Sequence, residues 1–185
     1  MRPEQASQVL ERATCLYQEA EIEAVLDNMA SAITKRLGAD NPILTCVMNG
    51  GLITAGKLAT RLNFPLEIDY LHVSRYRDKT SGGEFQWHRH PQASLKGRVA
   101  LIVDDILDEG ATLDHIVSYY KQQGCKEVYV AVLVEKLHDH KLASIEADFV
   151  GVQAHDEYLV GYGMDYKGYL RNAQGIYAIA AQDCD

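Results

Sequence analysis

One stretch of the sequence, Val99 to Tyr120, constrains the fold of this chain more than any other. It opens with five apolar residues at 99–103 without polar alternation, a pattern typical of a strand buried on both faces of a parallel sheet. Acidic and small residues follow at 104–112. Apolar residues from Leu113 to Tyr120 then recur at i, i+3, i+4 and i+7, which indicates an amphipathic helix. We therefore predict a strand, an acidic loop and a helix in that order.

The acidic loop would lie where open α/β sheets bind ligands, at the carboxyl end of a strand and the start of a helix. Free N–H groups at a helix start favour an anion, and Gly110 lets a phosphate approach the backbone closely. The carboxylates of Asp104, Asp105, Asp108 and Glu109 repel one another at neutral pH, so the loop needs a compensating partner. A sugar diol, a divalent cation or a base to be protonated would serve. A plain solvent-facing acidic loop that caps the helix is the alternative.

Composition limits the class of protein and of partner. The 185 residues suit one domain, and 47% hydrophobic with 24% charged residues is ordinary for a soluble globular chain. A net charge of −8 argues against a duplex nucleic acid partner, because phosphate binding needs a basic surface. The four cysteines are far apart, so we expect reduced thiols rather than disulfides or a zinc site. Without a membrane-length apolar run or a signal peptide, the expected location is cytoplasmic, with no membrane partner.

The rest of the chain alternates strand and helix patterns. Helices are expected at residues 18–37 and 52–62, with a weaker helical pattern at 1–17. Strands are expected at 43–48, 66–73, 127–134, 148–152 and 176–181. This alternation predicts a mostly parallel sheet with helices on both faces, joined by right-handed crossovers.

Three further segments carry candidate functional groups. The run Asn49-Gly50-Gly51 after a predicted strand offers a second helix start for an anion, although an ordinary tight turn explains the glycines equally well. The polar residues 74–84 predict a mobile lid loop, or else a surface hairpin with no catalytic part. His88 and His90 could bind a metal, but two such histidines on a strand more often share a solvent-facing side.

The run Val103 to Thr112, VDDILDEGAT, resembles the phosphoribosyl-diphosphate signature of type I phosphoribosyltransferases. That signature is an apolar strand, two acids, two apolar residues and then D-x-G-x-T. Residues 148–151, 158–166 and 169–171 look like the carboxyl-terminal third of hypoxanthine-guanine phosphoribosyltransferases, and the resemblance covers roughly 40–181 in matching order.

The resemblance implies an α/β fold of the type I phosphoribosyltransferase class. In that fold a mostly parallel central sheet is flanked by helices within one domain, here residues 1–185. A small hood subdomain would be formed by the N-terminal and C-terminal segments, and a mobile lid loop by residues of about 74–84.

The resemblance also implies roles on the phosphoribosyl side of a site. Asp104 and Asp105 match the acidic pair near the ribose hydroxyls, since carboxylates accept hydrogen bonds from a vicinal diol. Asp108 matches the acid–base group that faces N7 of the purine, and its acidic neighbours would help it exchange a proton near neutral pH. The cradle for the 5′-phosphate is matched by Asp108, Glu109, Gly110, Ala111 and Thr112.

Roles on the purine side follow in the same way. Lys136 matches the contact to the purine 6-oxo group, Tyr158 the aromatic ring stacked on the base, and Leu159 a backbone contact at the base edge. Taken singly, Lys136 could be an exposed strand end and Tyr158 a core residue. Their order and spacing relative to the signature favour the functional interpretation.

A magnesium ion and a diphosphate group complete the implied site. Asp165, beside the base, matches a magnesium ligand that acts through water, with Asp104 and Asp105 as the other metal ligands. Arg171 matches a diphosphate contact, for which a planar guanidinium is well suited. Surface positions for Asp165 and Arg171 are the simpler alternative when each is taken alone.

Two positions depart from the family pattern. Asn49 precedes Gly50 of the diphosphate loop where many relatives carry lysine, so a charge is lost that Arg171 or a lid arginine could supply. Arg75-Tyr76 stands where relatives commonly have Ser-Tyr in the lid, so Tyr76 carries over and the serine does not. Both departures leave the rate and the diphosphate affinity open.

The implied activity is purine salvage. The enzyme would use Mg²⁺ to transfer the 5-phosphoribosyl group from phosphoribosyl diphosphate to hypoxanthine or guanine, giving IMP or GMP and diphosphate. A xanthine-preferring enzyme is the nearest alternative. A non-catalytic nucleotide-sensing regulator of the same fold is another, although it would need a basic surface or an added DNA-binding domain. The partners would be small-molecule substrates and further copies of the chain, in a homodimer or homotetramer.

Overall fold

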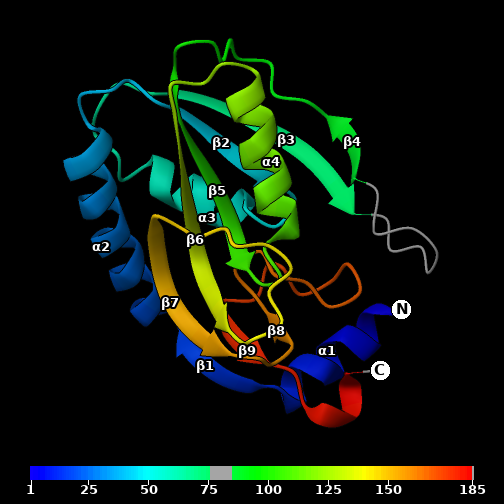
Figure 1. Ribbon diagram of the computed structural model, residues 1–185. Helices are drawn as coiled ribbons and strands as arrows, with labels where there is room; N and C mark the ends of the chain where they lie inside the picture. The colour runs from blue at the N-terminus through cyan, green and yellow to red at the C-terminus, as the bar shows by residue number, and fades with distance from the viewer. Residues whose placement is uncertain (76–84, 185) are drawn as a thin grey trace.

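The computed structural model describes residues 1–75 and 85–184, which form two sheets with helices packed against them (Figure 1). Within these residues the central sheet has the strand order β4-β3-β2-β5-β6-β7 and is parallel except for β4. Its strands are β2 (Ile43–Met48), β3 (Glu67–Arg75), β4 (Phe85–Arg89), β5 (Val99–Leu107), β6 (Glu127–Leu137) and β7 (Phe149–His155).

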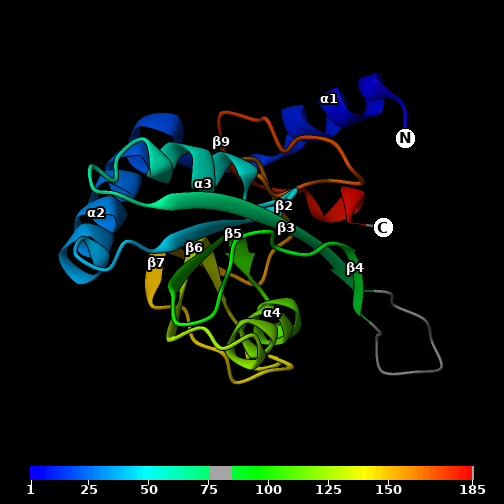
Figure 2. The same cartoon turned by 90° about the horizontal axis from the view of Figure 1, so that it is seen from above.

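Helices cover both faces of the central sheet. α2 (Glu19–Leu37) and α3 (Leu52–Ala59) lie on one face, and α4 (Ala111–Gln122) lies on the other, as Figure 2 shows. This arrangement confirms the predicted α/β architecture with a mostly parallel sheet. The carboxyl ends of β2, β5 and β6 consequently meet at one edge.

A smaller antiparallel sheet joins the two ends of the chain. It has the strand order β1-β9-β8, made of β1 (Thr14–Gln18), β9 (Gly175–Ala178) and β8 (Leu159–Val160). α1 (Pro3–Arg12) packs against it, and the short 3₁₀ helix η1 (Ala181–Asp183) follows β9. These are the segments that we assign to the hood, while the division of the chain into a single domain stays a prediction.

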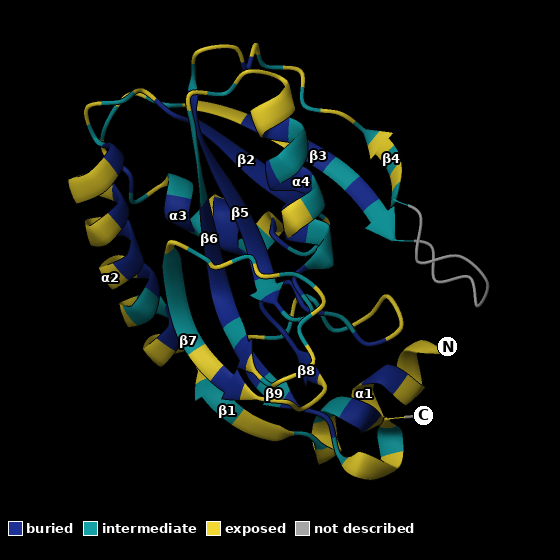
Figure 3. Cartoon of the chain, viewed as in Figure 1, coloured by how far each residue is buried: buried dark blue, intermediate teal, exposed yellow. Residues whose placement is uncertain are grey.

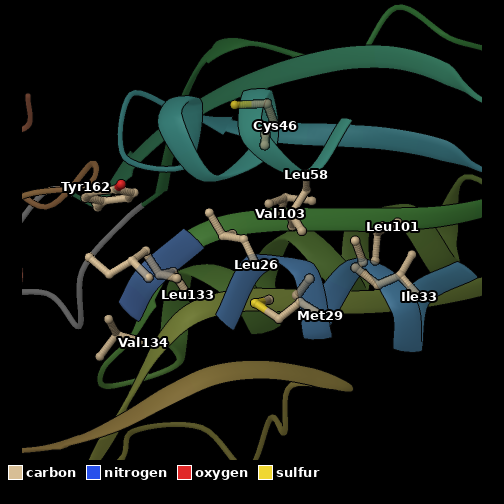
Figure 4. Close-up of a cluster of buried hydrophobic side chains, with 14 of the residues drawn as sticks. Leu26, Met29, Ile33, Cys46, Leu58, Leu101, Val103, Leu133, Val134 and Tyr162 are labelled. Atoms are coloured by element: carbon tan, nitrogen blue, oxygen red, sulfur yellow. The ribbon is translucent and has the colours of Figure 1, made fainter. Parts of the chain in front are cut away.

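β5 contributes to two apolar cores, one on each face of the sheet. Leu101 and Val103 point toward α2 and belong to the core seen in Figure 4, whereas Ala100 and Ile102 belong to the core under α4. All four side chains are fully buried, which Figure 3 shows as a dark band along β5. Burying one Leu or Ile side chain contributes about 1.5–3 kcal/mol, so the strand predicted from five apolar residues is among the firmest parts of the fold.

Several element bounds differ from the prediction. β5 continues to Leu107, so Asp104 and Asp105 lie in the strand rather than in a loop, because β6 extends the ladder up to the pair Leu107 and Glu135. The weak helical pattern at 1–17 is only partly right, since α1 ends at Arg12 and a strand follows. That strand forms by pairing with β9, a partner that no local pattern reveals.

Glu23 ties α2 to α3 and to the segment after β8. Its carboxylate forms ion pairs with Lys57 and Arg61, and it accepts a hydrogen bond from the Tyr162 hydroxyl at 2.9 Å. The hydrogen bond from Lys57, reinforced by those from Arg61 and Tyr162, lowers the pKa of Glu23 from 4.5 to about 2. The ionised Glu23 carboxylate is therefore stabilised by the folded protein relative to the unfolded chain.

We expect Glu23→Gln to destabilise the fold by about 1 kcal/mol at pH 7, a value reduced for solvent screening because the side chain is 31% exposed. A lowered folded-state pKa gives stability that is present above pH 4.5 and is lost as the pH falls toward 2. Urea denaturation at pH 7 and at pH 3 measures both effects. The variant should differ from the parent at pH 7 and approach it at pH 3. Glu11→Gln on the exposed side of α1 is the control, and an equal loss there would contradict the argument.

Candidate active site

A cleft of about 820 Å³ opens at the carboxyl edge of the central sheet, a volume that suits a nucleotide-sized ligand. It is lined by the end of β2, by the β5–α4 connection, by the end of β6 and by the segment around β8. Every site residue predicted within the described part of the chain lines it: Asn49, Gly50, Arg75, Asp104, Asp105, Asp108, Glu109, Gly110, Ala111, Thr112, Lys136, Tyr158, Leu159, Asp165 and Arg171. Tyr76 lies outside the described residues.

Two buried carboxylates, Asp104 and Asp105, lie at the floor of the cleft. Burial raises the pKa of Asp104 well above its ordinary value, and the charge of Asp105 adds to the shift. Burial also raises the pKa of Asp105, although Asp104 and Arg171 oppose that shift. The Arg171 guanidinium is 4.0 Å from Asp105 Oδ2. Such a pair is stabilised by a ligand that brings hydroxyl donors or positive charge.

Arg171 connects the sheet edge to the segment after β8. Its Nη2 atom is 2.6 Å from Asp165 Oδ1, and its Nη1 atom donates to the carbonyl oxygen of Gly163 at 2.5 Å. The other carboxylate oxygen of Asp165 accepts a hydrogen bond from the backbone N–H of Gly168 at 2.7 Å. Both oxygens of Asp165 are thus engaged within the protein.

The loop between β5 and α4 turns sharply at Gly110. Its φ of +81° is left-handed, and a Cβ atom there would lie 2.9 Å from Ile145 Cγ2, so both conformation and space favour glycine. The carbonyl oxygen of Glu109 accepts from the backbone N–H of Leu142 at 2.8 Å. Gly110, Ala111 and Thr112 at the start of α4 line the cleft, where backbone N–H groups of a helix start can bind an anion.

Asp108 lies between two nitrogen side chains at the other end of the loop. Lys136 Nζ is 3.2 Å from Asp108 Oδ2, and His138 Nε2 is 2.8 Å from Asp108 Oδ1. Lys136 Nζ is also 3.2 Å from Asp156 Oδ1, and the pKa of Asp156 is lowered chiefly by that hydrogen bond. The buried Lys136 therefore bridges two carboxylates at the rim of β6.

Asp108, His138, His140 and Asp156 form the only His/Asp group with metal-ligand geometry within residues 1–75 and 85–184, their ligand atoms lying within 4.8 Å of one another. The Lys136 ammonium already compensates both carboxylates of this group. We did not predict the two histidines or Asp156 from the sequence. The usable signal was the spacing of Lys136 and His138, since residues two apart on an extended segment point the same way.

His88 and His90 are both exposed and belong to no such group in the described part of the chain. His88 Nε2 is 2.8 Å from the Ser74 hydroxyl, and His90 stacks on Trp87 with ring centroids 4.5 Å apart. Their exposure agrees with the alternative that the two histidines share a solvent-facing side of the strand.

Tyr158 and Leu159 begin a further segment that lines the same cleft as Lys136. Tyr158 is 40% exposed and packs edge-on against Tyr166, with ring centroids 5.7 Å apart, so it is not the core residue that its apolar surroundings in the sequence suggested. Leu159 is buried in β8 and pairs with Ala178. An exposed aromatic ring and a buried lysine in one cleft suit a flat ligand with a polar edge.

Comparisons with known proteins decide the family. Residues 13–167 match the family model described as the phosphoribosyl transferase domain. The chain belongs to the phosphoribosyltransferases. It is 33% identical to the hypoxanthine-guanine phosphoribosyltransferase of Bacillus subtilis (strain 168) over 158 residues, which cover 85% of this chain and 87% of that relative. The corresponding protein of Streptococcus pneumoniae (strain ATCC BAA-255 / R6) is 31% identical with the same coverage.

Solved structures agree with the family. A hypoxanthine phosphoribosyltransferase from Staphylococcus aureus superposes with a TM-score of 0.87 at 28% identity, covering 92% of this chain and 93% of that one. A hypoxanthine-guanine-xanthine phosphoribosyltransferase gives a TM-score of 0.82 at 25% identity, covering 89% and 95%. The type I phosphoribosyltransferase fold and the resemblance to the hypoxanthine-guanine group are confirmed.

The two departures from the family pattern have different surroundings in this phosphoribosyltransferase. Asn49 is exposed on the cleft wall, directly after β2. β3 continues through Arg75, so Ser74 and Arg75, which were assigned to the lid loop at 74–84, belong to the strand. The rest of the predicted lid, 76–84, lies outside the described residues. Arg75 Nη1 is 2.7 Å from Glu109 Oε2, which links the end of β3 to the loop before α4.

Gly50, which follows Asn49, is in close contact with the segment after β8. A Cβ atom on Gly163, whose φ is +111°, would collide with the carbonyl oxygen of Gly50 and lie 3.1 Å from Asp105 Cβ. Here the two sides of the cleft touch through backbone atoms. The four cysteines of this phosphoribosyltransferase are free, and no helix in the described part of the chain is long and apolar enough to cross a membrane.

Proposed function

We propose that this phosphoribosyltransferase converts hypoxanthine or guanine to IMP or GMP by transfer of the 5-phosphoribosyl group from phosphoribosyl diphosphate. The observation that carries the proposal is the set of residues that line the cleft at the carboxyl edge of the central sheet. Buried carboxylates, an anion-binding helix start and a lysine–aspartate pair line it together. The names of the Bacillus and Streptococcus relatives support the choice of hypoxanthine and guanine.

The phosphoribosyl half of the site uses the β5–α4 segment. Asp104 and Asp105 accept hydrogen bonds from the ribose 2′- and 3′-hydroxyls, which supply the donors that two buried carboxylates need. The backbone N–H groups of the loop 108–112 and the Thr112 hydroxyl hold the 5′-phosphate at the start of α4. Backbone N–H groups at Gly50 and the Arg171 guanidinium contact the diphosphate.

The purine half lies between β6 and β8. Tyr158 stacks on the base, the backbone of Leu159 meets the base edge, and the Lys136 ammonium donates to the 6-oxo group. Asp108 faces N7 and accepts a proton as the base becomes bonded to the sugar. Its two contacts with Lys136 and His138 support this placement at the purine end.

The reaction is a displacement at the anomeric carbon. Purine N9 forms a bond to C1′ while the bond from C1′ to the diphosphate oxygen breaks, and the diphosphate leaves with the bonding electron pair. The ribose carries positive charge in the transition state, which fixed carboxylates such as Asp104 and Asp105 stabilise. Exclusion of water protects the reacting sugar from hydrolysis.

We propose Mg²⁺ as the cofactor, with Asp104, Asp105 and Asp165 as its ligands. The residues fit this ion, because Mg²⁺ takes oxygen ligands and two buried carboxylates have Arg171 at 4.0 Å as their neighbouring cation. Asp165 has both oxygens bonded to Arg171 and Gly168, so it would act through a water molecule. Bound magnesium would neutralise charge on the departing diphosphate.

The test is a rate measurement with magnesium, phosphoribosyl diphosphate and, separately, hypoxanthine, guanine, xanthine and adenine. We expect IMP and GMP to form fastest, and we expect a chelator to lower the rate by about 10²-fold or more until Mg²⁺ is restored. No nucleotide from any base would refute the enzyme. Fastest formation of the xanthine product would favour the xanthine-preferring alternative. One structural neighbour is named a hypoxanthine-guanine-xanthine phosphoribosyltransferase, so xanthine is included in the test. The net charge of −8 disfavours a DNA-binding regulator.

We also propose a cytoplasmic homodimer. The free cysteines support a reducing compartment. Ile68 and Tyr70 of β3 are 64% and 46% exposed on the same side of the strand, an apolar surface that self-association would cover.

Ile68→Glu is expected to convert the dimer to a monomer, because it places a charge where apolar area would be buried. Light scattering during gel filtration gives the mass directly. Leu142→Glu, at an exposed leucine outside β3, is the control and should leave the dimer intact. A monomeric parent, or an unchanged mass for Ile68→Glu, would contradict this proposal.

A further inference from the structure

We propose that His138 is a positioning residue for Asp108. In this inference His138 donates its Nε2–H to Asp108 and fixes the carboxylate beside Lys136, so that both can meet one purine. The inference rests on the proposed function, which gives Asp108 its role at the base. It adds a residue that the family signature does not include.

The first observation is the division of the Asp108 carboxylate between two donors. His138 Nε2 is 2.8 Å from Oδ1, and Lys136 Nζ is 3.2 Å from Oδ2. Both donors come from the end of β6, where Lys136 is the penultimate residue and His138 is the first beyond it. Asp108 is itself 43% exposed on a loop, so its own packing does not determine the plane of its carboxylate. Two bonds from one strand end determine it.

The second observation concerns the tautomer of His138. Its side chain is 4% exposed, and Nδ1 is buried with no hydrogen-bond partner within residues 1–75 and 85–184. A proton on Nδ1 would leave a buried donor unsatisfied, and it would also turn the Nε2 lone pair toward a carboxylate oxygen 2.8 Å away. A proton on Nε2 replaces the lone-pair repulsion with a hydrogen bond to Asp108 and leaves Nδ1 as a buried acceptor rather than a buried donor. The ring therefore carries its proton toward Asp108.

The ring of His138 also packs against a second histidine. His140 stacks on it with ring centroids 3.7 Å apart and an interplanar angle of 12°. His140 Nε2 in turn is 3.6 Å from Asp156 Oδ2. The charged and titratable groups around His138 are thus Asp108 from the β5–α4 loop, Lys136 from β6, His140 from the same segment and Asp156 from the segment after β7.

For the reaction, Asp108 and the purine 6-oxo group compete for the Lys136 ammonium. Without His138, Asp108 is free to rotate and to give both oxygens to Lys136, which would withdraw the ammonium from a purine 6-oxo group. With His138 in place, one carboxylate oxygen is engaged on each side, and the lysine keeps a donor available. The expected defect on removing His138 is thus in the use of the purine rather than of phosphoribosyl diphosphate.

The kinetic test compares three variants with hypoxanthine as the acceptor. His138→Leu removes the donor and should lower kcat/KM for hypoxanthine by about 10–100-fold, with KM for phosphoribosyl diphosphate unchanged. His138→Gln keeps an N–H donor on a side chain of similar reach and should recover most of the loss. His90→Leu, at an exposed histidine outside the cleft, should match the parent. Equal rates for His138→Leu and parent would overturn the proposal, as would equal losses in the Leu and Gln variants.

A double-mutant cycle separates positioning from a merely structural role. If His138 acts through Asp108, adding His138→Leu to Asp108→Asn should cost less than about twofold further, because the two residues act as a unit. A full additional loss in the Asp108→Asn background would overturn the proposal. Melting temperatures of the single variants accompany the rates, and rescue by Gln distinguishes donor loss from unfolding.

A measurement independent of turnover distinguishes failure of this inference from failure of the proposed function. Nitrogen-15 NMR of the imidazole rings reports which nitrogen of His138 carries the proton. We expect the Nε2–H form, with a resonance that moves in Asp108→Asn. An Nδ1–H form would overturn the inference even in an active enzyme. An inactive parent with the Nε2–H form and an Asp108-dependent resonance would refute the proposed function while leaving the His138–Asp108 pair established.

Discussion

Replacing Asp108 with asparagine is expected to lower kcat for IMP formation by about 10²–10⁴-fold, while binding of phosphoribosyl diphosphate changes by less than about threefold. Asparagine has nearly the same shape but cannot accept a proton from the base. Its amide also places an NH2 donor against one of the two groups, Lys136 and His138, that approach the carboxylate at 3.2 and 2.8 Å. The loss falls on the chemical step because the phosphate cradle uses backbone groups of the same loop.

Asp156→Asn is the matched control for this prediction. Asp156 also lies 3.2 Å from Lys136 Nζ, but it has no role in accepting a proton in the proposed reaction. Its replacement should change kcat by less than about tenfold. Pre-steady-state rates and equilibrium binding of phosphoribosyl diphosphate measure the two quantities separately. Equal turnover in Asp108→Asn and the parent would refute the acid–base role of Asp108.

Gly163→Ala is expected to damage both stability and activity. The left-handed φ of +111° disfavours alanine, and the new Cβ atom would collide with the carbonyl oxygen of Gly50. Because the obstacle is backbone, the chain must move, at a cost of about 2–5 kcal/mol in unfolding free energy. Displacing the Gly50 loop should also lower kcat/KM for phosphoribosyl diphosphate by about 10²-fold.

Gly168→Ala isolates the conformational part of that loss. Gly168 has φ +87°, but nothing lies within 4 Å of a Cβ atom built there. It should cost only about 1–2 kcal/mol and leave kcat/KM near the parent value. Urea denaturation and steady-state kinetics with varied phosphoribosyl diphosphate give both comparisons. If the two alanine variants lose the same unfolding free energy and the same kcat/KM, the contact between Gly163 and Gly50 does not contribute to activity.

The sequence predicted the parts of this molecule that are local along the chain. The bounds of β2 were predicted without error, and those of α2 within a residue, because each follows one unbroken apolar pattern. The grouping of residues 104–112 in the cleft was predicted because they lie consecutively in the sequence. The family resemblance supplied the residues assigned to the purine, which come from separate segments of the same cleft, and the ligand roles of both groups stay predictions.

The rest depends on contacts between residues far apart in the sequence. β1 needs β9 as a partner, and Arg75 meets Glu109 only after the sheet has formed. His138 was missed because a histidine after a strand has no meaning until Asp108, thirty positions earlier, is brought to 2.8 Å. Propensity and spacing describe neighbours along the chain, whereas these pairs are set by the topology of the sheet.

The extension of β5 through Leu107 has a consequence for how this enzyme can change over evolution. Asp104 and Asp105 belong to the strand whose preceding residues fill both apolar cores, so their carboxylates are held by a backbone that is packed on both faces. A substitution that loosens either core would therefore also move the two acids that we propose bind the sugar. Along this strand, tolerance to mutation is tied to the proposed transfer chemistry, whereas acceptor preference can change at the end of β6 and around β8 without disturbing β5.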